Sequence, residues 1–326
     1  MKIFLTGASG FIGTATTRML LKQGHVVYAM SRSESSDKAI VSTGAIPIRC
    51  QLNEVTIEHL HQSDIVIHAA AMVESWGDRK EFWHTNVEGT RQLVNIAKAA
   101  GVKRFIHIST EAVLWTGKNL IDIDENTPYS TSTSFLYGET KKEAEKLVVA
   151  ANETGKFETI VVRPRLVWGP EDKTILPAAI AMYKKGHFTW INKGAAKTST
   201  SHIYNVIEGI RLAIEKGKGG QVYFITDDEI SSLHKFFTAL FSTQGITIKA
   251  GSMPAGFVNF IASVLEPIWK LLGIKSAPPV TKTAACLMSC DCTIRNDKAK
   301  KELGYNPVIT VEEGIKELAA SFKLNG

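Results

Sequence analysis

Hydrophobic and polar positions follow two different periods along the first half of the chain. Short runs rich in β-branched residues predict strands, and longer stretches with an apolar position every three or four residues predict helices. The predicted strands are Lys2–Thr6, His25–Met30, Ala45–Arg49, Ile65–Ala69, Phe105–Ser109 and Thr159–Val162, with a later one at Gln221–Thr226. The predicted helices are Gly10–Gln23, Asn86–Ala100 and Tyr137–Ala151. Strands that alternate with helices indicate a parallel sheet covered on both faces.

The pattern becomes less regular after Pro164, where prolines interrupt the chain more often. We therefore predict an α/β protein of the Rossmann type, with a doubly wound parallel sheet and a smaller C-terminal substrate-binding domain. A dinucleotide-binding domain would cover residues 1–167 and include a return segment at 203–226. Most of residues 168–326 would form the substrate-binding domain.

Composition narrows the class of protein without naming a function. The 326 residues are 44% hydrophobic and 21% charged, as in ordinary water-soluble proteins. The net charge of +6 comes without a block of Lys and Arg, which argues against a nucleic-acid partner. The first apolar run, Ile3–Leu5, is too short for a signal peptide, so we expect a cytoplasmic protein.

Four cysteines do not make a disulfide framework in a chain of this length. Three of them, Cys286, Cys290 and Cys292, lie close together, but their spacing fits no usual zinc pattern. We expect buried thiols on a strand and no metal site.

A glycine-rich turn joins the first predicted strand to the first predicted helix. In the string TGASGFIG, Gly7 permits the tight turn, Gly10 lets the backbone approach a pyrophosphate, and Gly13 lets the helix pack close to the strand. The helix N-terminus offers N–H groups to phosphates. The turn therefore predicts a dinucleotide site.

The end of the second strand bears on which dinucleotide is bound. An acidic residue there would bind the ribose hydroxyls of NAD, but the chain has Met30-Ser31-Arg32-Ser33. Arg32 can bind a 2′-phosphate with its planar guanidinium, assisted by a hydroxyl. NADP(H) is favoured. NAD(H) is the alternative, in which Arg32 is a solvated surface residue.

A tyrosine and a lysine lie one helical turn apart at Tyr137 and Lys141. A phenol is a poor acid–base catalyst at neutral pH until a nearby cation favours its ionised form, and the Lys141 ammonium would be that cation. Ser109 and Thr110 end a predicted strand, at the edge where parallel sheets bind ligands. These four residues form a candidate catalytic group.

With these motifs, the chain resembles the extended short-chain dehydrogenases/reductases over essentially its full length. The matching segments, in order, are TGASGFIG, His68–Ala71, Asn86–Thr90, Ser109–Thr110, Tyr137–Lys141, Arg163–Pro170, Tyr204–Val206 and Asp297–Tyr305. A looser likeness from Pro254 through Glu266 to Thr281 indicates the 3β-hydroxysteroid dehydrogenase-like branch.

The resemblance implies a role for each candidate residue. Thr110 would hold the substrate oxygen, Tyr137 would exchange a proton with it, Lys141 would tune Tyr137 and bind the nicotinamide ribose, and Asn86 would order the site. Glu111, which follows Thr110, departs from the pattern of the dehydratases and is expected to be a solvated or pocket-rim carboxylate. The cofactor would be bound by Gly7, Ser9, Gly10, Phe11, Ile12, Gly13, Ser31, Arg32, Leu52, Ala69, Ala70, Ala71, Lys141, Pro164 and Val167.

Two further segments suggest surfaces. Apolar residues at helical spacing between Phe257 and Leu272 predict a helix that covers the substrate pocket, and the alternative is an interfacial helix on a membrane, since Trp and Lys suit that boundary. The resemblance also implies a homodimer, with an apolar stripe formed by Ala144, Leu147, Val148 and Ala151, which the sequence does not distinguish from packing within one chain.

The sequence thus favours an NADP(H)-dependent oxidoreductase that interconverts a ketone and a secondary alcohol on an apolar small molecule. One alternative is a nucleotide-sugar epimerase or dehydratase that recycles a bound NAD. Another is a non-catalytic dinucleotide sensor. The Tyr137/Lys141 pair argues against the last, because such members tend to lose it.

Overall fold

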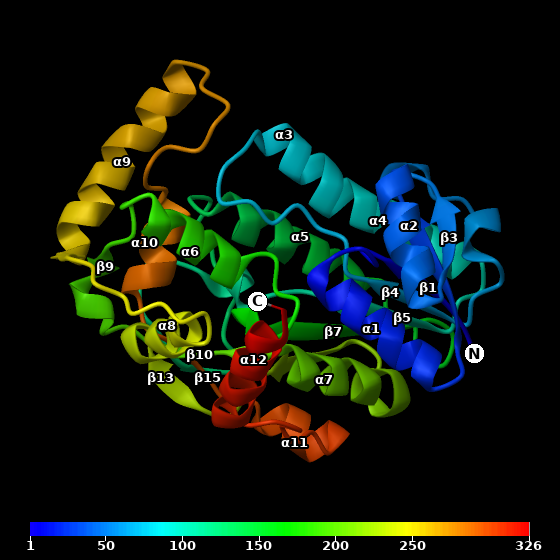
Figure 1. Cartoon of the computed structure of the whole chain (residues 1–326). Coiled ribbons are helices and arrows are strands. Elements are labelled where there is room, and N and C mark those ends of the chain that lie inside the picture. Colours follow the sequence, from blue (N-terminus) through cyan, green and yellow to red (C-terminus); the bar gives the residue numbers. More distant parts are fainter. Residues whose placement is uncertain (326) are drawn as a thin grey trace.

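A seven-stranded parallel sheet forms the centre of the molecule in the computed structural model, which describes residues 1–325 (Figure 1). The strand order is β12-β7-β5-β4-β1-β2-β3. The strands are β1 (Lys2–Thr6), β2 (Val26–Ser31), β3 (Ile46–Arg49), β4 (Ile65–His68), β5 (Arg104–Ile108), β7 (Glu158–Pro164) and β12 (Gln221–Ile225). All their pairings are parallel, so the predicted Rossmann-type sheet is confirmed.

Helices cover both faces of this sheet because successive side chains of each strand point to opposite sides. In β1, Ile3 and Leu5 join the core beneath α1 and α7, whereas Phe4 joins the core beneath α4 and α5. The covering helices are α1 (Phe11–Lys22), α2 (Glu34–Thr43), α4 (Gly89–Ala99), α5 (Leu136–Ala150) and α7 (Ile203–Lys216). The predicted helix from Asn86 differs at its start, where α3 (Arg79–Phe82) and a π-helical turn (Trp83–Glu88) precede α4.

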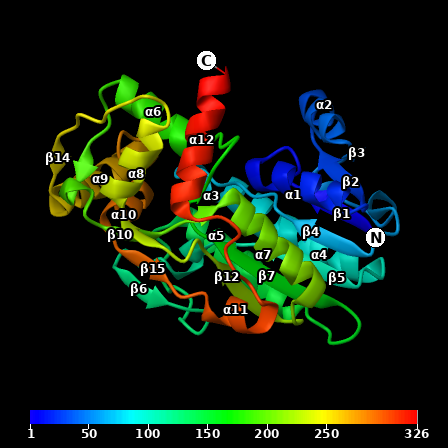
Figure 2. The same ribbon diagram turned by 60° about the horizontal axis from the view of Figure 1, so that its bottom comes forward.

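The second half of the chain builds a separate layer beside the sheet (Figure 2). Its largest sheet has the order β13-β10-β15-β6, formed by β13 (Ile230–Ser232), β10 (Lys197–Ser199), β15 (Cys292–Ile294) and β6 (Leu120–Ile123). Two small parallel pairs join β8 (Val167–Trp168) to β11 (Ser201–His202) and β9 (Trp190–Ile191) to β14 (Ser252–Met253). Its helices are α6 (Ile175–Lys184), α8 (Leu233–Ser242), α9 (Ala255–Leu271), α10 (Lys282–Ser289) and α12 (Val311–Asn325). Helix α11 (Asp297–Leu303) packs instead against α7 and β12 of the central sheet.

Short 3₁₀ turns complete the elements, at Leu52–Glu54, Glu58–Leu60, Glu111–Leu114 and Asn192–Gly194. Within residues 1–325, none of the helices combines the length and the apolar character needed to cross a membrane.

The three neighbouring cysteines lie mostly outside strands, and the prediction of thiols on one strand is wrong for two of them. Cys286 lies in α10 and Cys290 caps its end, while Cys292 alone lies in β15. Helix α10 begins after Thr281 because the Thr281 hydroxyl accepts a hydrogen bond from the Ala284 N–H (3.0 Å), which satisfies a donor of the first turn.

Candidate active site

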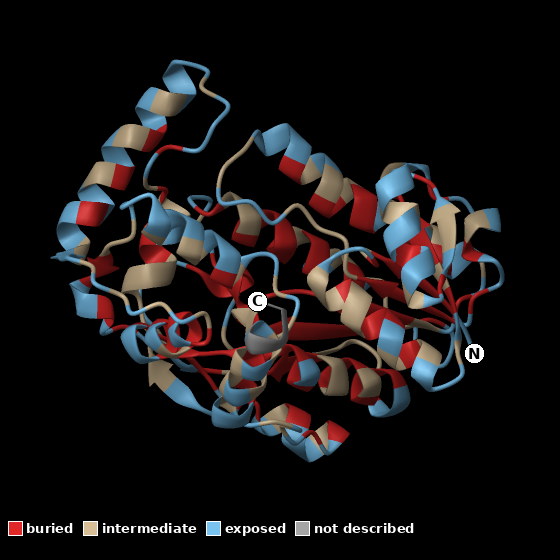
Figure 3. Ribbon diagram, viewed as in Figure 1, coloured by how far each residue is buried: buried red, intermediate tan, exposed pale blue. Residues whose placement is uncertain are grey.

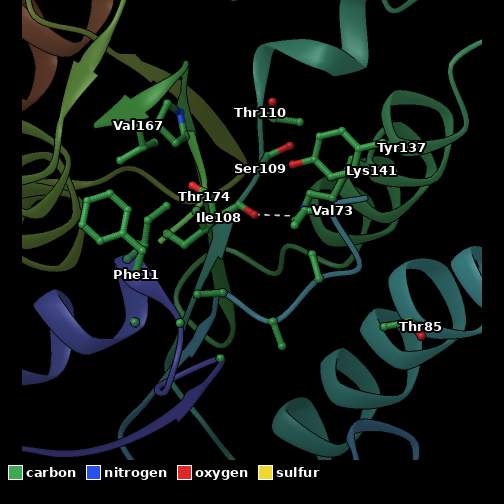
Figure 4. Close-up of a pocket in the computed structure, with 18 of the residues that line it drawn as sticks. Phe11, Val73, Thr85, Ile108, Ser109, Thr110, Tyr137, Lys141, Val167 and Thr174 are labelled. Carbon is green, nitrogen blue, oxygen red and sulfur yellow. Dashed lines mark hydrogen bonds between the residues drawn. The ribbon is translucent and has the colours of Figure 1, made fainter. Parts of the chain in front are cut away.

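A cavity of about 830 Å³ lies at the carboxyl ends of the parallel strands (Figure 4). Among the predicted cofactor residues, it is lined by Gly7, Ser9, Gly10, Phe11, Ile12, Gly13, Arg32, Leu52, Ala69, Ala70, Ala71, Lys141, Pro164 and Val167. The predicted catalytic residues Thr110, Tyr137 and Lys141 line it too, but Ser31 and Asn86 do not. The structure therefore brings most of the predicted site together around one space.

The glycine turn has the tight geometry that the sequence predicts. Gly7 has a φ of +75°, and a Cβ there would lie 2.7 Å from the carbonyl carbon of Ala69. A Cβ on Gly13 would lie 2.0 Å from the Gly7 oxygen, so the start of α1 can pack against the turn only without a side chain. No side chain caps α1, which leaves its first N–H groups free for an anion. These features fit a dinucleotide pyrophosphate.

Hydroxyls and one arginine line the opposite end of the cavity, beyond β2. Arg32 is exposed there, together with Ser33, Ser35 and Ser36. The buried Ser31 lies beneath them, and its hydroxyl contacts the Ser36 Oγ (2.6 Å) and donates to the Ser33 carbonyl. Ser31 thus supports the loop rather than lining the cavity.

Lys141 is fully enclosed at the catalytic end. Its Nζ donates to the Ile108 carbonyl (2.7 Å, the dashed line in Figure 4) and lies 3.2 Å from the His107 Nε2. Burial lowers the pKa of Lys141 to about 8, and the charge of Glu145 opposes this effect. Burial also lowers the pKa of His107 well below its ordinary value, with the Lys141 charge adding to it, so the ring is neutral. The lysine keeps donor capacity for a ligand.

Tyr137 lies at the start of α5, facing Thr110 (Figure 4). Burial raises the pKa of Tyr137, the charge of Glu111 raises it further, and a hydrogen bond with Thr110 partly opposes both. The expected lowering by Lys141 is not seen in the chain alone, because burial and Glu111 dominate. Tyr137 is therefore a protonated phenol at neutral pH, able to donate a proton.

Glu111 is neither solvated nor at the rim, contrary to the prediction. Only 4% of its surface is exposed, and it forms a buried ion pair with Arg165, which is 2% exposed. The Thr110 hydroxyl donates to the Glu111 Oε2 (2.8 Å) and accepts from the Ala112 N–H (3.2 Å). Arg165 Nε donates to the Thr198 hydroxyl (3.0 Å). The ion pair thus fixes the direction of the Thr110 hydroxyl.

The neighbouring hydroxyl of Ser109 points into a different network. It donates to Glu145, which also binds the guanidinium of Arg163 and accepts from the Tyr129 hydroxyl (2.8 Å). Glu145 and Arg163 are almost wholly buried. Ser109 and Thr110 thus each donate a hydroxyl proton to a buried carboxylate, and both line the cavity.

Asn86 orders the site from outside the cavity. Its amide accepts from the Met72 N–H (2.8 Å) and donates to the Met72 carbonyl (3.0 Å) and to the Thr140 hydroxyl (3.0 Å). It therefore ties the loop that follows β4 to Thr140 of α5, the residue before Lys141. This geometry makes Asn86 a positioning residue and not a catalytic one.

Sequence reasoning missed the residues that form much of the outer wall. Between the catalytic group and solvent the wall is mostly apolar, and its members are Val73, Trp115, Leu166, Ile175, Thr283, Ala284 and Leu287. The last three lie in or beside one face of α10. The helical spacing of these three residues could have indicated this wall. We predicted instead that the preceding apolar segment covers the pocket.

That preceding segment, α9, contributes no residue to the cavity wall, so the prediction that it covers the pocket is wrong. It packs on α10, one layer further out. Of the stripe predicted for a dimer, Ala144 and Val148 are 0% exposed within the single chain, because α5 packs against α4 and the sheet. The homodimer stays a prediction.

A metal-ligand cluster was not expected, and the side chains that the structure describes contain no group of three His, Cys, Asp or Glu suited to holding a metal ion.

Comparison with known proteins identifies the family. The model of the NAD dependent epimerase/dehydratase family matches residues 3–226. A 4-hydroxy-2-methyl-3-oxo-4-farnesyl-3,4-dihydroquinoline-1-oxide ketoreductase of Stigmatella aurantiaca is 38% identical over 98% of this chain and 96% of its own length. A decarboxylating sterol-4-alpha-carboxylate 3-dehydrogenase of Dictyostelium discoideum is 34% identical over 97% of this chain and 99% of its own.

A solved UDP-glucuronic acid 4-epimerase from Bacillus cereus, in complex with NAD, superposes with a TM-score of 0.77 at 21% identity. It covers 100% of this chain and 99% of its own, and at this identity it supports the fold alone. The predicted likeness to the 3β-hydroxysteroid dehydrogenase-like branch is confirmed by relatives that carry such names. The chain belongs to the NAD dependent epimerase/dehydratase family and is an NAD(P)-dependent enzyme of the extended short-chain dehydrogenase/reductase type.

Proposed function

We propose that this enzyme uses NADPH to reduce a ketone on an apolar substrate to a secondary alcohol. The observation that carries the proposal is the catalytic end of the cavity, where the protonated phenol of Tyr137 and the fixed hydroxyl of Thr110 face a largely apolar wall. In the reduction of a ketone the carbonyl oxygen must receive a proton, and the Tyr137 hydroxyl is a donor that lines the cavity.

NADP(H) is the cofactor that the adenosine end of the cavity fits. Arg32 and three serines line this end, and Glu111, the one acidic residue among the described lining residues, lies at the catalytic end. Arg49, the nearby alternative cation, is paired with Asp37. Arg32 is thus available to bind a 2′-phosphate.

The bound nicotinamide supplies a hydride to the carbonyl carbon. Tyr137 donates its proton to the carbonyl oxygen, so the product is the alcohol and the phenolate takes up a proton from water. Thr110 keeps the oxygen within reach of Tyr137. The ammonium of Lys141, held by the Ile108 carbonyl, lines the cavity and has donor capacity for the nicotinamide ribose.

The substrate class follows from the outer wall. Trp115, Leu166, Ile175 and Leu287 offer apolar surface, which favours a ring system or a prenyl chain over a nucleotide sugar. Two of the relatives are named for a farnesyl-bearing ketone and for a sterol, which supports the same class.

A substrate screen tests this function. The purified chain is assayed for oxidation of NADPH and NADH with a farnesylated quinolone ketone, a 3-keto sterol and cyclohexanone. The account predicts turnover of one of the two large ketones with NADPH, well above that of cyclohexanone. Copurifying NAD, with epimerisation of UDP-glucuronic acid and no ketone turnover, would overturn it.

The cofactor preference is tested by Arg32→Ala, with Lys38→Ala as a control of equal charge change on the neighbouring helix. Lys38 is exposed, pairs with Glu34 and does not line the cavity. Loss of the guanidinium should weaken NADPH binding by at least about tenfold and NADH binding by less than about twofold. Equal weakening of both dinucleotides by Arg32→Ala would contradict the assignment.

A further inference from the structure

The face of helix α9 that packs against the rest of the protein has an unusual composition. The residues that it buries are Val258, Ala262 and Glu266, spaced four apart on one narrow stripe that packs against α10 and Ile191. The stripe is made of small or polar side chains. A helix of a water-soluble protein normally buries its large apolar residues instead.

The large apolar residues of α9 lie on a second stripe that faces solvent. This apolar face consists of Phe257 (54% exposed), Phe260 (66%), Val264 (42%), Ile268 (41%), Leu271 (87%) and Leu272 (65%). The spacing of three and four residues places the first five on one side of the helix. Figure 3 shows α9 standing away from the body of the molecule, with its outer side exposed. Contiguous apolar surface of this kind marks an interaction site.

The segment that carries the apolar face is mostly basic. Residues 249–290 contain four lysines (Lys249, Lys270, Lys275 and Lys282) and one acidic residue, Glu266. The Glu266 carboxylate is buried and accepts a hydrogen bond from the Lys282 N–H (2.7 Å). Lys270 and Lys275 are exposed beside Leu271 and Leu272. A partner should therefore be apolar and anionic.

We propose that the apolar face of α9 docks on the surface of an anionic phospholipid bilayer. The apolar side chains would enter the boundary between headgroups and acyl chains, with Lys270 and Lys275 among the phosphates. A second copy of the chain is a poorer partner, because a two-fold contact would place the same lysine-flanked patches against each other. The helix does not span the bilayer.

Helix α9 lies one layer outside the catalytic cavity, with its apolar face on the side opposite α10. Helix α10, on which α9 packs, contributes Ala284 and Leu287 to the cavity wall. At the other end, Lys270 stacks over the Trp76 ring (5.7 Å), in the loop that supplies Val73 to the wall. The docking itself does not depend on the proposed reaction.

Coflotation of the full chain with vesicles tests the docking. Vesicles of phosphatidylcholine alone are compared with vesicles that also contain phosphatidylglycerol. The wild-type chain should float with the anionic vesicles, and Phe260→Ser/Leu271→Ser should lower its partition coefficient by at least about tenfold. The control Val41→Ser/Ile121→Ser removes two exposed apolar residues elsewhere and should change it by less than about twofold.

The double variant Lys270→Gln/Lys275→Gln tests the contribution of the two lysines to binding. Its control is Lys22→Gln/Lys103→Gln, which has the same net charge. Only the first pair should reduce the preference for anionic vesicles, by at least about fivefold. Circular dichroism verifies that each variant is folded, and Phe257→Ser/Leu272→Ser serves as a second apolar variant.

Three results would overturn the proposal. They are no flotation of the wild-type chain with either vesicle, equal flotation of the apolar variants, and a wild-type dimer that those variants dissociate in the absence of lipid. Because none of these readouts uses catalysis, failure of the docking and failure of the proposed reaction are distinguishable.

Discussion

At the scale of single residues, the site depends on a buried charge pair that lies behind the reacting groups. Glu111 and Arg165 are both nearly inaccessible, and Glu111 holds the hydroxyl of Thr110. The desolvation that two buried charges require is offset only while each has its partner. The hydroxyl that faces the substrate thus takes its orientation from an interaction that never touches the substrate.

Glu111→Gln should destabilise the fold by about 3 kcal/mol, because it leaves the Arg165 guanidinium buried without a counter-charge. The double variant Glu111→Gln/Arg165→Met should recover more than half of that loss, since it removes both charges. Urea unfolding monitored by circular dichroism measures both free energies. Glu34→Gln, in an exposed ion pair, is the control and should cost less than about 0.5 kcal/mol. A double variant no more stable than the single one would show that the pair does not act as a unit.

At the scale of the elements, one buried histidine ties strand β4 to strand β1 and helix α4. His68 of β4 lies between the hydroxyl of Thr6 in β1 (2.7 Å) and that of Thr90 in α4 (2.9 Å). Burial lowers the pKa of His68 to about 3, and the charge of Lys141 adds to the effect. Its ring is therefore neutral in the folded chain throughout the physiological range.

The fold should lose stability as the pH falls below about 6.5. The unfolded chain takes up a proton on His68 near its ordinary pKa, whereas the folded chain does not until about pH 3, so each step down favours unfolding. At pH 5 this amounts to about 2 kcal/mol for His68. Urea unfolding at pH 7 and pH 5 measures the difference.

Replacing the histidine isolates its share of this pH dependence. His68→Gln should reduce the stability difference between the two pH values by about 2 kcal/mol, whatever its effect on stability at pH 7. His187→Gln, at an exposed histidine, should leave the difference unchanged. An unaltered difference in His68→Gln would contradict the buried, neutral state of this ring.

The elements also show where sequence reasoning works. The seven strands of the dinucleotide-binding sheet and helices α1, α4 and α5 follow periods of two and about 3.6 residues. Their ends were predicted to within one or two residues, except at the π-helical turn before α4, whereas no bounds were predicted for α2 and α7. The second sheet was not predicted, because β6, β10 and β15 have three or four residues each and meet from distant parts of the chain. A period cannot be read from so short a strand.

The residues of the candidate site were likewise only partly predictable from the sequence. Glycines, Tyr137 and Lys141 carry local patterns, and the structure places them around one cavity. The burial of Glu111 depends on Arg165, which is distant in sequence, and no local pattern reports it. Helix α9 misled the prediction because its large apolar residues are exposed, which reverses the usual inference from apolar spacing to burial.

At the scale of the whole molecule, the sheet edge and α10 enclose one cavity with two ends. Arg32 and the serines after β2 lie at one end, and Tyr137 with Thr110 lies at the other, beneath the apolar wall. This arrangement matches a long dinucleotide at the sheet edge and an apolar ketone between it and the second layer. In the proposed reaction, the proton comes from Tyr137.

That claim is tested most directly by Tyr137→Phe, in single-turnover reduction of the best ketone from the screen with NADPH bound. The reduction rate should fall by at least about a hundredfold, because the phenol is the proton donor, while the NADPH dissociation constant should change by less than about twofold. A rate within about threefold of the wild-type value would contradict the account.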